Sequence, residues 1–313
     1  MRTRKYVGED GYKSKMTKKV NKAVIPVAGL GTRMLPATKA IPKELLPVYD
    51  RPIIEHVVQE AISGGISEII LVTRSGKEAI ENHFDAHYEL EHRLDKKGKE
   101  TVLGSIKDII PDSVKVTSVR QHDALGLGHA LLCAKHLLDH EPFAVLLPDV
   151  FVLDQVSRAK NYSFMRLVQA WDESGTGQIM VERVEVDSVE NYGIVDLNGE
   201  INKPFWSLEV KGLVEKPSPQ RAPSNLAILG RYVLPFQVLE LLEHTAPGVG
   251  GEIQLTDALD ELQGSQGLNA VETDAQVFDC GNKLGFLSAN LAAGMRDPET
   301  RSASKALYFK GDE

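Results

Sequence analysis

The stretch KAVIPVAGLGTR (residues 22–33) runs from a short apolar segment straight into a glycine-rich loop that ends in an arginine. The segment Lys22–Ala28 predicts a first β-strand, because short runs rich in Val and Ile favour strands. Glycine allows a close backbone approach, so the loop N–H groups could point at a phosphate chain while Arg33 bridges its oxygens. We interpret the loop as a candidate polyphosphate cradle, although such a loop alone also suits a plain turn.

Beyond this loop, short β-branched runs alternate with amphipathic stretches, which indicates an α/β fold. Further strands are expected at Glu68–Thr73, Lys115–Arg120 and Phe143–Leu147, with helices at Ile53–Ser63, Lys77–Phe84 and Gly128–Leu138. Right-handed crossovers between such strands build a mostly parallel, doubly wound sheet whose ligands bind beyond the carboxyl ends of the strands.

The second half of the chain repeats this alternation less regularly. Strands are expected at Gln178–Val184, Ile194–Asp196, Lys211–Val214 and Ile228–Val233, and helices at Phe164–Glu173, Phe236–Glu243, Ile253–Leu262 and Leu284–Ala293. No low-complexity linker separates the two halves, so we expect one domain over residues 21–297. Residues 1–20 are predicted to be a flexible extension, and residues 298–313 a C-terminal tail.

Composition and charge exclude several classes of partner. The chain has 313 residues, and 36 basic against 44 acidic side chains give a net charge of −8. This balance offers no general attraction to nucleic acid or to an anionic membrane, so an anionic ligand needs a local basic site. The sequence shows neither a signal peptide nor an apolar run long enough to span a membrane. Only Cys133 and Cys280 are present, which favours a reduced, cytoplasmic setting.

Prolines stiffen the segment that follows the loop, LPATKAIPKELLP (residues 35–47), and this segment presents Lys39 and Lys43 close to the loop in sequence. The combined run PVAGLGTRMLPATKAIPKELLP (residues 26–47) resembles the sugar-1-phosphate nucleotidyltransferases. Further matching motifs are RQ (120–121), GLGHA (126–130), LPDV (147–150), VEKP (214–217), APSNLA (222–227), GEIQLTDA (251–258) and DCGNK (279–283). The series covers about 22–295 and favours the uridylyl branch of that family.

The resemblance implies a Rossmann-like mixed sheet, mostly parallel and sandwiched by helices, of the GT-A-like type. It also implies that the loop residues hold the nucleotide phosphates, that two cations activate them, and that two aspartates bind Mg²⁺. The loop residues are Ala28, Gly29, Leu30, Gly31 and Thr32, the cations are Arg33 and Lys43, and the aspartates are Asp149 and Asp279. Asp149 follows the expected strand FAVLL, where a hard carboxylate suits Mg²⁺, although an isolated aspartate there is often a cap.

The remaining roles concern the base and the sugar. The amide of Gln121 could pair with the imide edge of uracil, and Gly126 could let a base lie against the backbone. By resemblance, Glu44 lies near the base or ribose. The resemblance further assigns Glu215 to the hexose hydroxyls, Lys216 to the phosphates as a fourth catalytic residue, Gly193 to a backbone contact with the hexose and Asn225 to the sugar pocket.

Nucleotidyl transfer needs positioning and charge neutralisation more than a covalent nucleophile, so the absence of a nucleophilic triad is no objection. The resemblance implies transfer of a uridylyl group from UTP to α-D-glucose 1-phosphate, giving UDP-glucose and pyrophosphate, by a homodimer or homotetramer that binds neither nucleic acid nor membrane. Two alternatives stay open: a thymidylyl or broader hexose-1-phosphate transferase, and a non-catalytic regulatory paralogue that binds nucleotide sugar.

Overall fold

The structure, a computed structural model, describes residues 17–155, 157 and 159–309. Residues 1–16 of the predicted extension therefore lie outside the described residues, as do residues 310–313 of the predicted tail. The described end of the extension contacts the body of the protein, because the Trp171 indole donates a hydrogen bond to the Lys18 carbonyl at 2.9 Å. Val20 is buried beside it.

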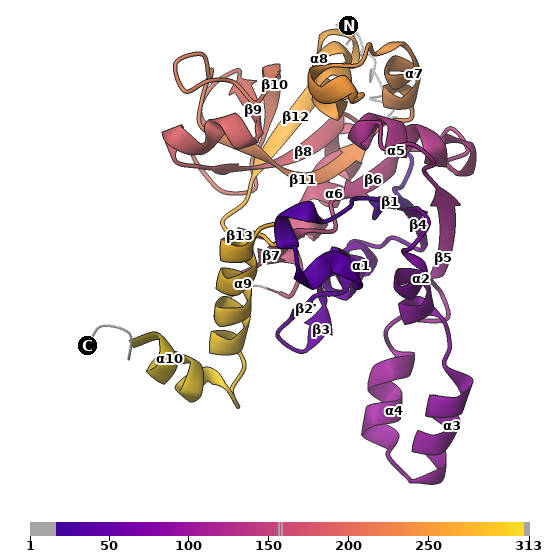
Figure 1. Ribbon diagram of the computed structural model, residues 1–313. Helices are drawn as coiled ribbons and strands as arrows, with labels where there is room; N and C mark the ends of the chain where they lie inside the picture. Colours follow the sequence, from indigo (N-terminus) through magenta and orange to yellow (C-terminus); the bar gives the residue numbers. More distant parts are fainter. Residues whose placement is uncertain (1–16, 156, 158, 310–313) are drawn as a thin grey trace, which may run out of the picture.

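A nine-stranded sheet forms the centre of the molecule (Figure 1). Its order is β5 (Lys115–Arg120), β4 (Glu68–Thr73), β1 (Lys22–Pro26), β6 (Phe143–Leu146), β11 (Leu226–Leu234), β8 (Gly177–Arg183), β12 (Leu268–Glu272), β10 (Ser207–Glu215) and β9 (Gly193–Leu197). The predicted mixed α/β fold is confirmed.

The sheet is less parallel than expected. Strands β1, β4, β5 and β6 pair in parallel, as the crossover pattern predicts. In the second half only β12 and β8 are parallel, whereas β9, β10 and β11 make antiparallel pairs. The reason is that no helix lies between β9 and β11 in the chain, so successive strands there connect by loops and reverse direction.

Helices cover both faces of the sheet (Figure 1). Apolar side chains of α5 (Gly126–Ala134), α7 (Gln237–His244) and α8 (Leu255–Gln266) pack on one face. Those of α1 (Ile53–Ser63), α2 (Glu78–Phe84) and α6 (Tyr162–Ser174) pack on the other. Strands β4 and β6 are therefore almost wholly buried, as their unbroken apolar runs predict.

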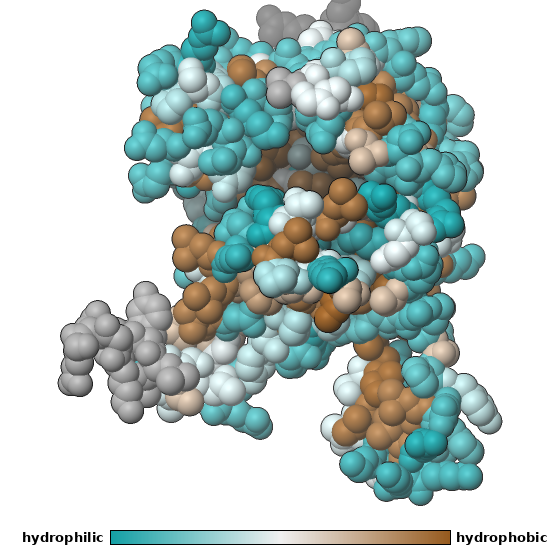
Figure 2. Space-filling view, in the orientation of Figure 1, coloured by the Kyte–Doolittle hydropathy of each residue, from teal (hydrophilic) through white to brown (hydrophobic). Residues whose placement is uncertain are grey.

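Several elements were not expected from the sequence. Helices α3 (Tyr88–Lys96) and α4 (Glu100–Lys107) form a hairpin that projects from the body, and neither has a buried residue (Figures 1 and 2). Two short sheets pair β7 (Val150–Leu153) with β13 (Gln276–Asp279), and β2 (Pro47–Val48) with β3 (Arg51–Pro52). The helix expected at Leu284–Ala293 is α9 (Lys283–Arg296), whereas α10 (Arg301–Phe309), within the predicted tail, was not expected. None of the described helices is both long and apolar enough to cross a bilayer.

Candidate active site

Asp149 lies in the turn between β6 and β7, at the carboxyl end of a central strand. The Lys43 ammonium donates to it, with 2.6 Å between Lys43 Nζ and Asp149 Oδ2. Although desolvation opposes both shifts, this pairing raises the pKa of Lys43 and lowers the pKa of Asp149. Both side chains are therefore charged at neutral pH, a cation and an anion held together in a poorly solvated place.

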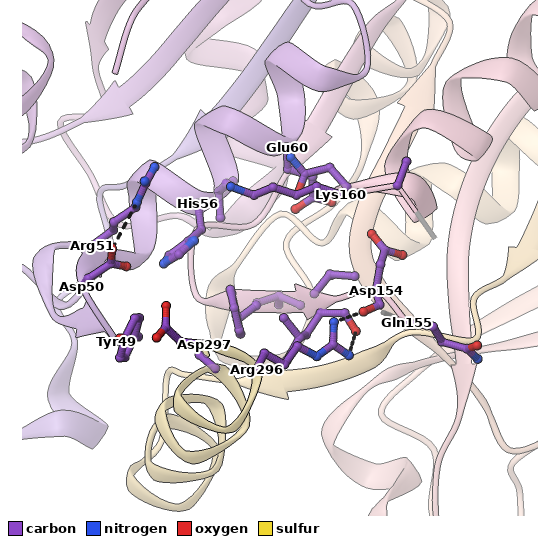
Figure 3. A pocket seen from close by; sticks show the side chains of 18 of the residues that line it. Tyr49, Asp50, Arg51, His56, Glu60, Asp154, Gln155, Lys160, Arg296 and Asp297 are labelled. Carbon is purple, nitrogen blue, oxygen red and sulfur yellow. Dashed lines mark hydrogen bonds and ion pairs between the residues drawn. The ribbon is translucent and has the colours of Figure 1, made fainter. Parts of the chain in front are cut away.

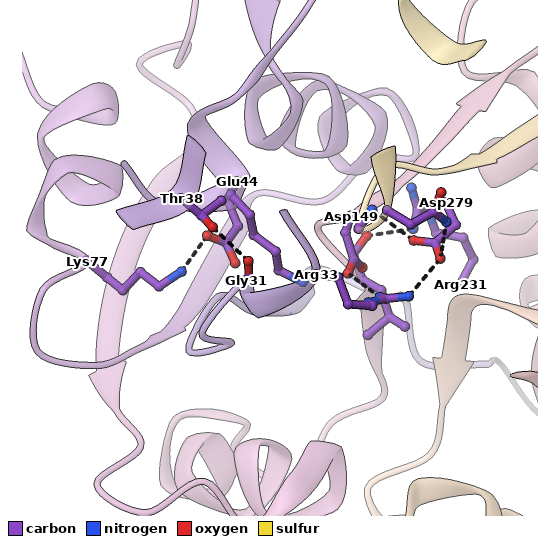
Figure 4. A network of polar contacts seen from close by, with 12 residues as sticks. Gly31, Arg33, Thr38, Glu44, Lys77, Asp149, Arg231 and Asp279 are labelled. Carbon is purple, nitrogen blue, oxygen red and sulfur yellow. Dashed lines mark hydrogen bonds and ion pairs between the residues drawn. The ribbon is translucent and has the colours of Figure 1, made fainter. Parts of the chain in front are cut away.

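Asp279 is brought beside Asp149 by the small β7–β13 sheet, in which Asp279 lies opposite Val150. The Cys280 N–H donates to the Asp149 carbonyl at 2.8 Å and ties the two strand ends together. Arg33 completes the group, since its Nη1 lies 3.1 Å from Asp279 Oδ2 and its Nη2 lies 4.0 Å from Asp149 Oδ2 (Figure 4). Four predicted residues, far apart in sequence, thus meet at one point.

The two carboxylates fit a divalent cation that takes few ligands from the protein. A β carbon on Gly281 would lie 2.9 Å from Asp149 Oδ2, 2.9 Å from Asp279 Oδ1 and 2.6 Å from Arg33 Nη2. Glycine at this position therefore keeps a small cradle open between two anionic oxygens. No group of three or more His, Cys, Asp or Glu in the described chain could hold a metal ion. Such a pair of carboxylates could hold a divalent cation whose other ligands are water and phosphate oxygens.

A cavity of about 710 Å³ opens from this point and brings together six predicted residues. They are Arg33, Asp149, Gly193, Glu215, Lys216 and Asp279. The space-filling view shows a hollow on this face, between α8 and the glycine-rich loop (Figure 2). The volume is within the range of pockets that hold a small ligand.

Glu215 and Lys216 line one wall of this cavity at the end of β10. The Glu215 carboxylate accepts a hydrogen bond from Thr256 Oγ1 at 2.7 Å and pairs with Lys216 Nζ at 3.2 Å. The two side chains of a regular strand would point to opposite faces. Here Lys216 has a φ of +46°, a conformation that residues with a β carbon rarely adopt, and it ends the alternation.

The glycine-rich loop lies beside Lys43. Gly29 is close enough that a β carbon on it would lie 3.6 Å from Lys43 Nζ. The Thr38 hydroxyl donates to the Gly31 carbonyl at 2.7 Å and fixes the loop against the proline-rich segment (Figure 4). Ala28 is buried, whereas Leu30 and Thr32 are exposed. The loop is therefore held from behind, with its exposed residues available to a ligand.

Beyond Lys43 and the loop residues 28–32, four more predicted residues are absent from the described lining of this cavity: Glu44, Gln121, Gly126 and Asn225. Gln121 donates through Nε2 to the Gly126 carbonyl at 3.1 Å, which joins the two residues assigned to the base. Glu44 is fully buried and pairs with Lys77 at 2.6 Å between Oε2 and Nζ, while its Oε1 has no partner (Figure 4). Asn225 donates to the Val184 carbonyl at 3.0 Å and ties β11 to the end of β8. Their ligand-binding roles stay predictions.

The comparison with known proteins bears on this geometry. A family model described as Nucleotidyl transferase matches residues 22–294, a span that includes every residue of the site. The chain belongs to the nucleotidyl transferase family. The family predicted from the motifs is confirmed, and nucleotidyltransferases of this kind generally use a divalent metal ion.

Relatives of this nucleotidyltransferase are similar over most of its length. It is 50% identical over 278 residues to the UTP–glucose-1-phosphate uridylyltransferase of Escherichia coli K12, covering 89% of this chain and 91% of that protein. It is 48% identical over 275 residues to the protein of the same name from Haemophilus influenzae, covering 88% and 93%. A solved structure of UTP-bound UGPase from Acinetobacter baumannii aligns with a TM-score of 0.85 and 48% identity, covering 93% of this chain and 99% of that one.

Sequence reasoning missed several groups that line the nucleotidyltransferase cavity. Glu182, Tyr192 and Thr256 all contribute to it. Burial raises the pKa of Glu182 to about 7. Thr256 stands inside the motif GEIQLTDA quoted above, and Tyr192 directly precedes the assigned Gly193, so their places in the sequence are the signals that could have found them. The signal for Glu182 is a lone carboxylate in the mostly apolar run QIMVE.

Proposed function

We propose that this chain transfers a uridylyl group from UTP to α-D-glucose 1-phosphate, giving UDP-glucose and pyrophosphate. The observation that carries the proposal is the meeting of Arg33, Lys43, Asp149 and Asp279 at the mouth of a cavity whose far wall carries Glu215 and Lys216. The uridylyltransferases named above, about half identical in sequence, support this choice of nucleotide and sugar.

In the proposed reaction the sugar phosphate attacks the α-phosphorus of UTP in line, and pyrophosphate leaves. Arg33 and Lys43 bind and neutralise the phosphate oxygens, which is the main demand of such a transfer. The loop residues 28–32 position the triphosphate through their backbone N–H groups. Asp149 and Asp279 would hold Mg²⁺, which supplies charge neutralisation on the phosphates when bound.

The sugar end of the cavity has its own set of groups in this proposal. Glu215, oriented by Thr256, accepts hydrogen bonds from the glucose hydroxyls, and Lys216 binds the sugar phosphate. Gly193, opposite Glu215 in the β9–β10 register, offers its backbone to the hexose. Asn225 belongs to the same sugar pocket in this proposal. Gln121 and Gly126 select uracil. Glu44, the residue after Lys43, lies near the base or ribose.

The test compares kcat/KM for UTP and for dTTP with glucose 1-phosphate and Mg²⁺. Uracil and thymine differ by one methyl group, a contrast worth about 1–3 kcal/mol in a pocket, so we expect UTP to be preferred by at least tenfold. A preference for dTTP would replace the proposal by thymidylyl transfer. Purified protein that binds UDP-glucose and yet releases no pyrophosphate would be the regulatory paralogue.

We further propose that residues 21–297 act as one catalytic unit, with residues 1–20 and 298–313 as appendages, and that the chain forms a homodimer or homotetramer. Leu284 and Leu287 on α9 support an interface, because they are 74% and 57% exposed. Two unpaired thiols, Cys133 and Cys280, suit the reducing conditions of the cytoplasm, where we place the reaction. Light scattering of the purified protein would measure the oligomer.

A further inference from the structure

We propose that Arg231, held by Glu60, is a positioning residue for Asp149. Arg231 donates to the backbone of the turn that carries this carboxylate (Figure 4), and neither Arg231 nor Glu60 lines the cavity. The inference rests on the proposed function, in which Asp149 holds the metal ion. It adds a residue pair that touches neither substrate nor metal and yet sets where the metal-binding oxygens lie.

Every N–H of the Arg231 guanidinium has an acceptor. Nε and Nη2 donate to the two Glu60 oxygens at 2.9 and 2.8 Å. Nη1 donates to the carbonyls of Leu147 and Gly230 at 3.0 and 3.3 Å, and Nη2 also donates to the Val150 carbonyl at 2.7 Å. Arginine offers five donors in a rigid plane, and all five are used here.

Two of these acceptors bracket the metal-binding residue. Leu147 and Val150 stand on either side of Pro148-Asp149, so one planar group fixes both ends of a two-residue turn. The Cys280 N–H and the Lys43 ammonium then hold Asp149 itself. A turn fixed at both ends leaves the carboxylate little freedom to move relative to Asp279.

A bulge in β11 aims Arg231 at this turn. The register of β11 against β8 shifts between Ile228 and Tyr232. Gly230, within that shift, has a φ of +67°, and a β carbon there would lie 2.5 Å from Leu147 Cδ1. Bulges re-aim side chains next to active sites, and glycine makes this one possible. The charged side chain is thereby fully buried in a strand whose other members are apolar or glycine, apart from the Tyr232 hydroxyl.

Glu60 connects this turn to the phosphate loop through a single helix. It lies in the last turns of α1, beside a second cavity that the helix shares with β7 and α9 (Figure 3). At the other end of α1, the Ile53 N–H donates to the Leu46 carbonyl at 3.1 Å, three residues after Lys43. The same helix therefore supports both partners of the Lys43–Asp149 pair.

The Glu60–Arg231 pair has a more specific geometry than stability requires. A buried ion pair is often replaced by apolar residues of similar volume at little cost in stability, so stability alone does not account for this pair. Lysine could keep the charge but not the planar fork that spans Leu147 and Val150. Groups that orient metal ligands typically change metal affinity or activity by about 10- to 100-fold when replaced.

The experiment uses the full chain in three variants: Arg231→Lys, the double variant Glu60→Met with Arg231→Met, and the control Leu138→Ala. The control truncates a fully buried side chain that precedes β6 in the chain, whereas the turn with Asp149 follows this strand. Thermal unfolding measures stability. Loss of the free Mn²⁺ electron paramagnetic resonance signal, with UDP-glucose present, measures metal binding without turnover. Steady-state kinetics then give kcat and KM for UTP.

We expect Arg231→Lys and the double variant to raise the Mn²⁺ dissociation constant about tenfold and to lower kcat about 10- to 100-fold, with KM for UTP changed by less than about threefold. The double variant is expected to stay folded, and Leu138→Ala to lose stability but keep wild-type Mn²⁺ binding. Wild-type Mn²⁺ binding and kcat in a folded double variant would overturn the inference, as would equal losses in Leu138→Ala. If the wild-type protein binds Mn²⁺ and forms UDP-glucose, the proposed function holds, and such a result in the variants counts against the role of Arg231 alone. A wild-type protein that binds no Mn²⁺ would overturn both.

Discussion

Lys43 Nζ and Asp149 Oδ2 lie 2.6 Å apart, although 106 positions separate the two residues in the chain. The pair joins the proline-rich segment to the turn between β6 and β7. Substrate phosphates are anionic and can pair with Lys43. A metal ion is cationic and can pair with Asp149. The two side chains thus keep each other ionised until charged ligands replace one partner or the other.

Replacing Lys43 by Met should lower kcat by about 10²-fold or more, because a cation that neutralises developing phosphate charge is lost. Lys39→Met, in the same segment but exposed, serves as the control and should keep near wild-type turnover. Initial rates of pyrophosphate release measure both. Equal rates in the two variants would remove Lys43 from the reaction.

Asp149→Asn should lower kcat by about 10²- to 10³-fold and change the UDP dissociation constant by less than about threefold. The carboxylate contributes mainly where charge develops in the transition state, whereas UDP binding depends on other contacts as well. Asp196→Asn, at a half-buried position of β9 and paired with Lys211, is the matched control. Calorimetric titration with UDP and turnover measurements separate the two effects, and unchanged turnover would take Asp149 out of the metal site.

Gly281→Ala should abolish most metal-dependent activity while leaving the fold intact. The added β carbon would stand 2.9 Å from an oxygen of each carboxylate, in the space proposed for the cation. Gly264→Ala in α8 is the matched control, because a β carbon there meets nothing within 4 Å. Alanine in a helix is favoured over glycine by about 0.5–1 kcal/mol, so the control should be slightly more stable than wild type. Turnover near the wild-type value in Gly281→Ala would show that the metal lies elsewhere.

Glu182 should make the stability of the protein depend on pH. Burial raises its pKa from an ordinary 4.5 to about 7, so the folded chain holds a proton that the unfolded chain releases. The folded state binds more protons between these values, and the free energy of unfolding therefore falls as pH rises from about 4.5 to 7. The penalty is roughly 3 kcal/mol at most.

Glu182→Gln removes that penalty because the amide cannot ionise. The variant should match wild type at pH 5 and exceed its free energy of unfolding at pH 8, as measured by denaturant unfolding at both values. Glu240→Gln, an exposed position on α7, should show no such trend. A Glu182→Gln advantage that is the same at both pH values would contradict the prediction.

Much of the sheet and its helices could be predicted from the sequence. The bounds of β4, β5 and α1 agree with the prediction residue for residue, because each combines a clear apolar period with flanking turn or cap residues. Helices α3 and α4 were missed for the opposite reason: they bury nothing, so no apolar stripe marks them. Strand β12 was missed because a five-residue run carries too little pattern to locate its place between β8 and β10.

The site was predictable as a set of residues but not as an arrangement. The motifs point to Arg33, Lys43, Asp149 and Asp279, whereas their meeting depends on the β7–β13 pairing, which joins segments remote in the chain. Glu60 and Arg231 gave only weak signals, a lone arginine in the apolar run LAILGRYVL and a glutamate on the inner face of α1. A lone charge in an apolar strand predicts a buried partner but does not say which one.

The position of β12 in the sheet affects how the protein folds during its synthesis on the ribosome. The parallel half of the sheet, with Lys43 and Asp149, emerges early, but β12 enters between β8 and β10, strands that have already left the ribosome. Asp279 and the Cys280 N–H follow later still. The nascent chain therefore cannot complete its sheet strand by strand, and a chain stopped short of β13 has one carboxylate of the site without the other. Only a finished molecule is able to assemble the full charge pattern that its substrates require.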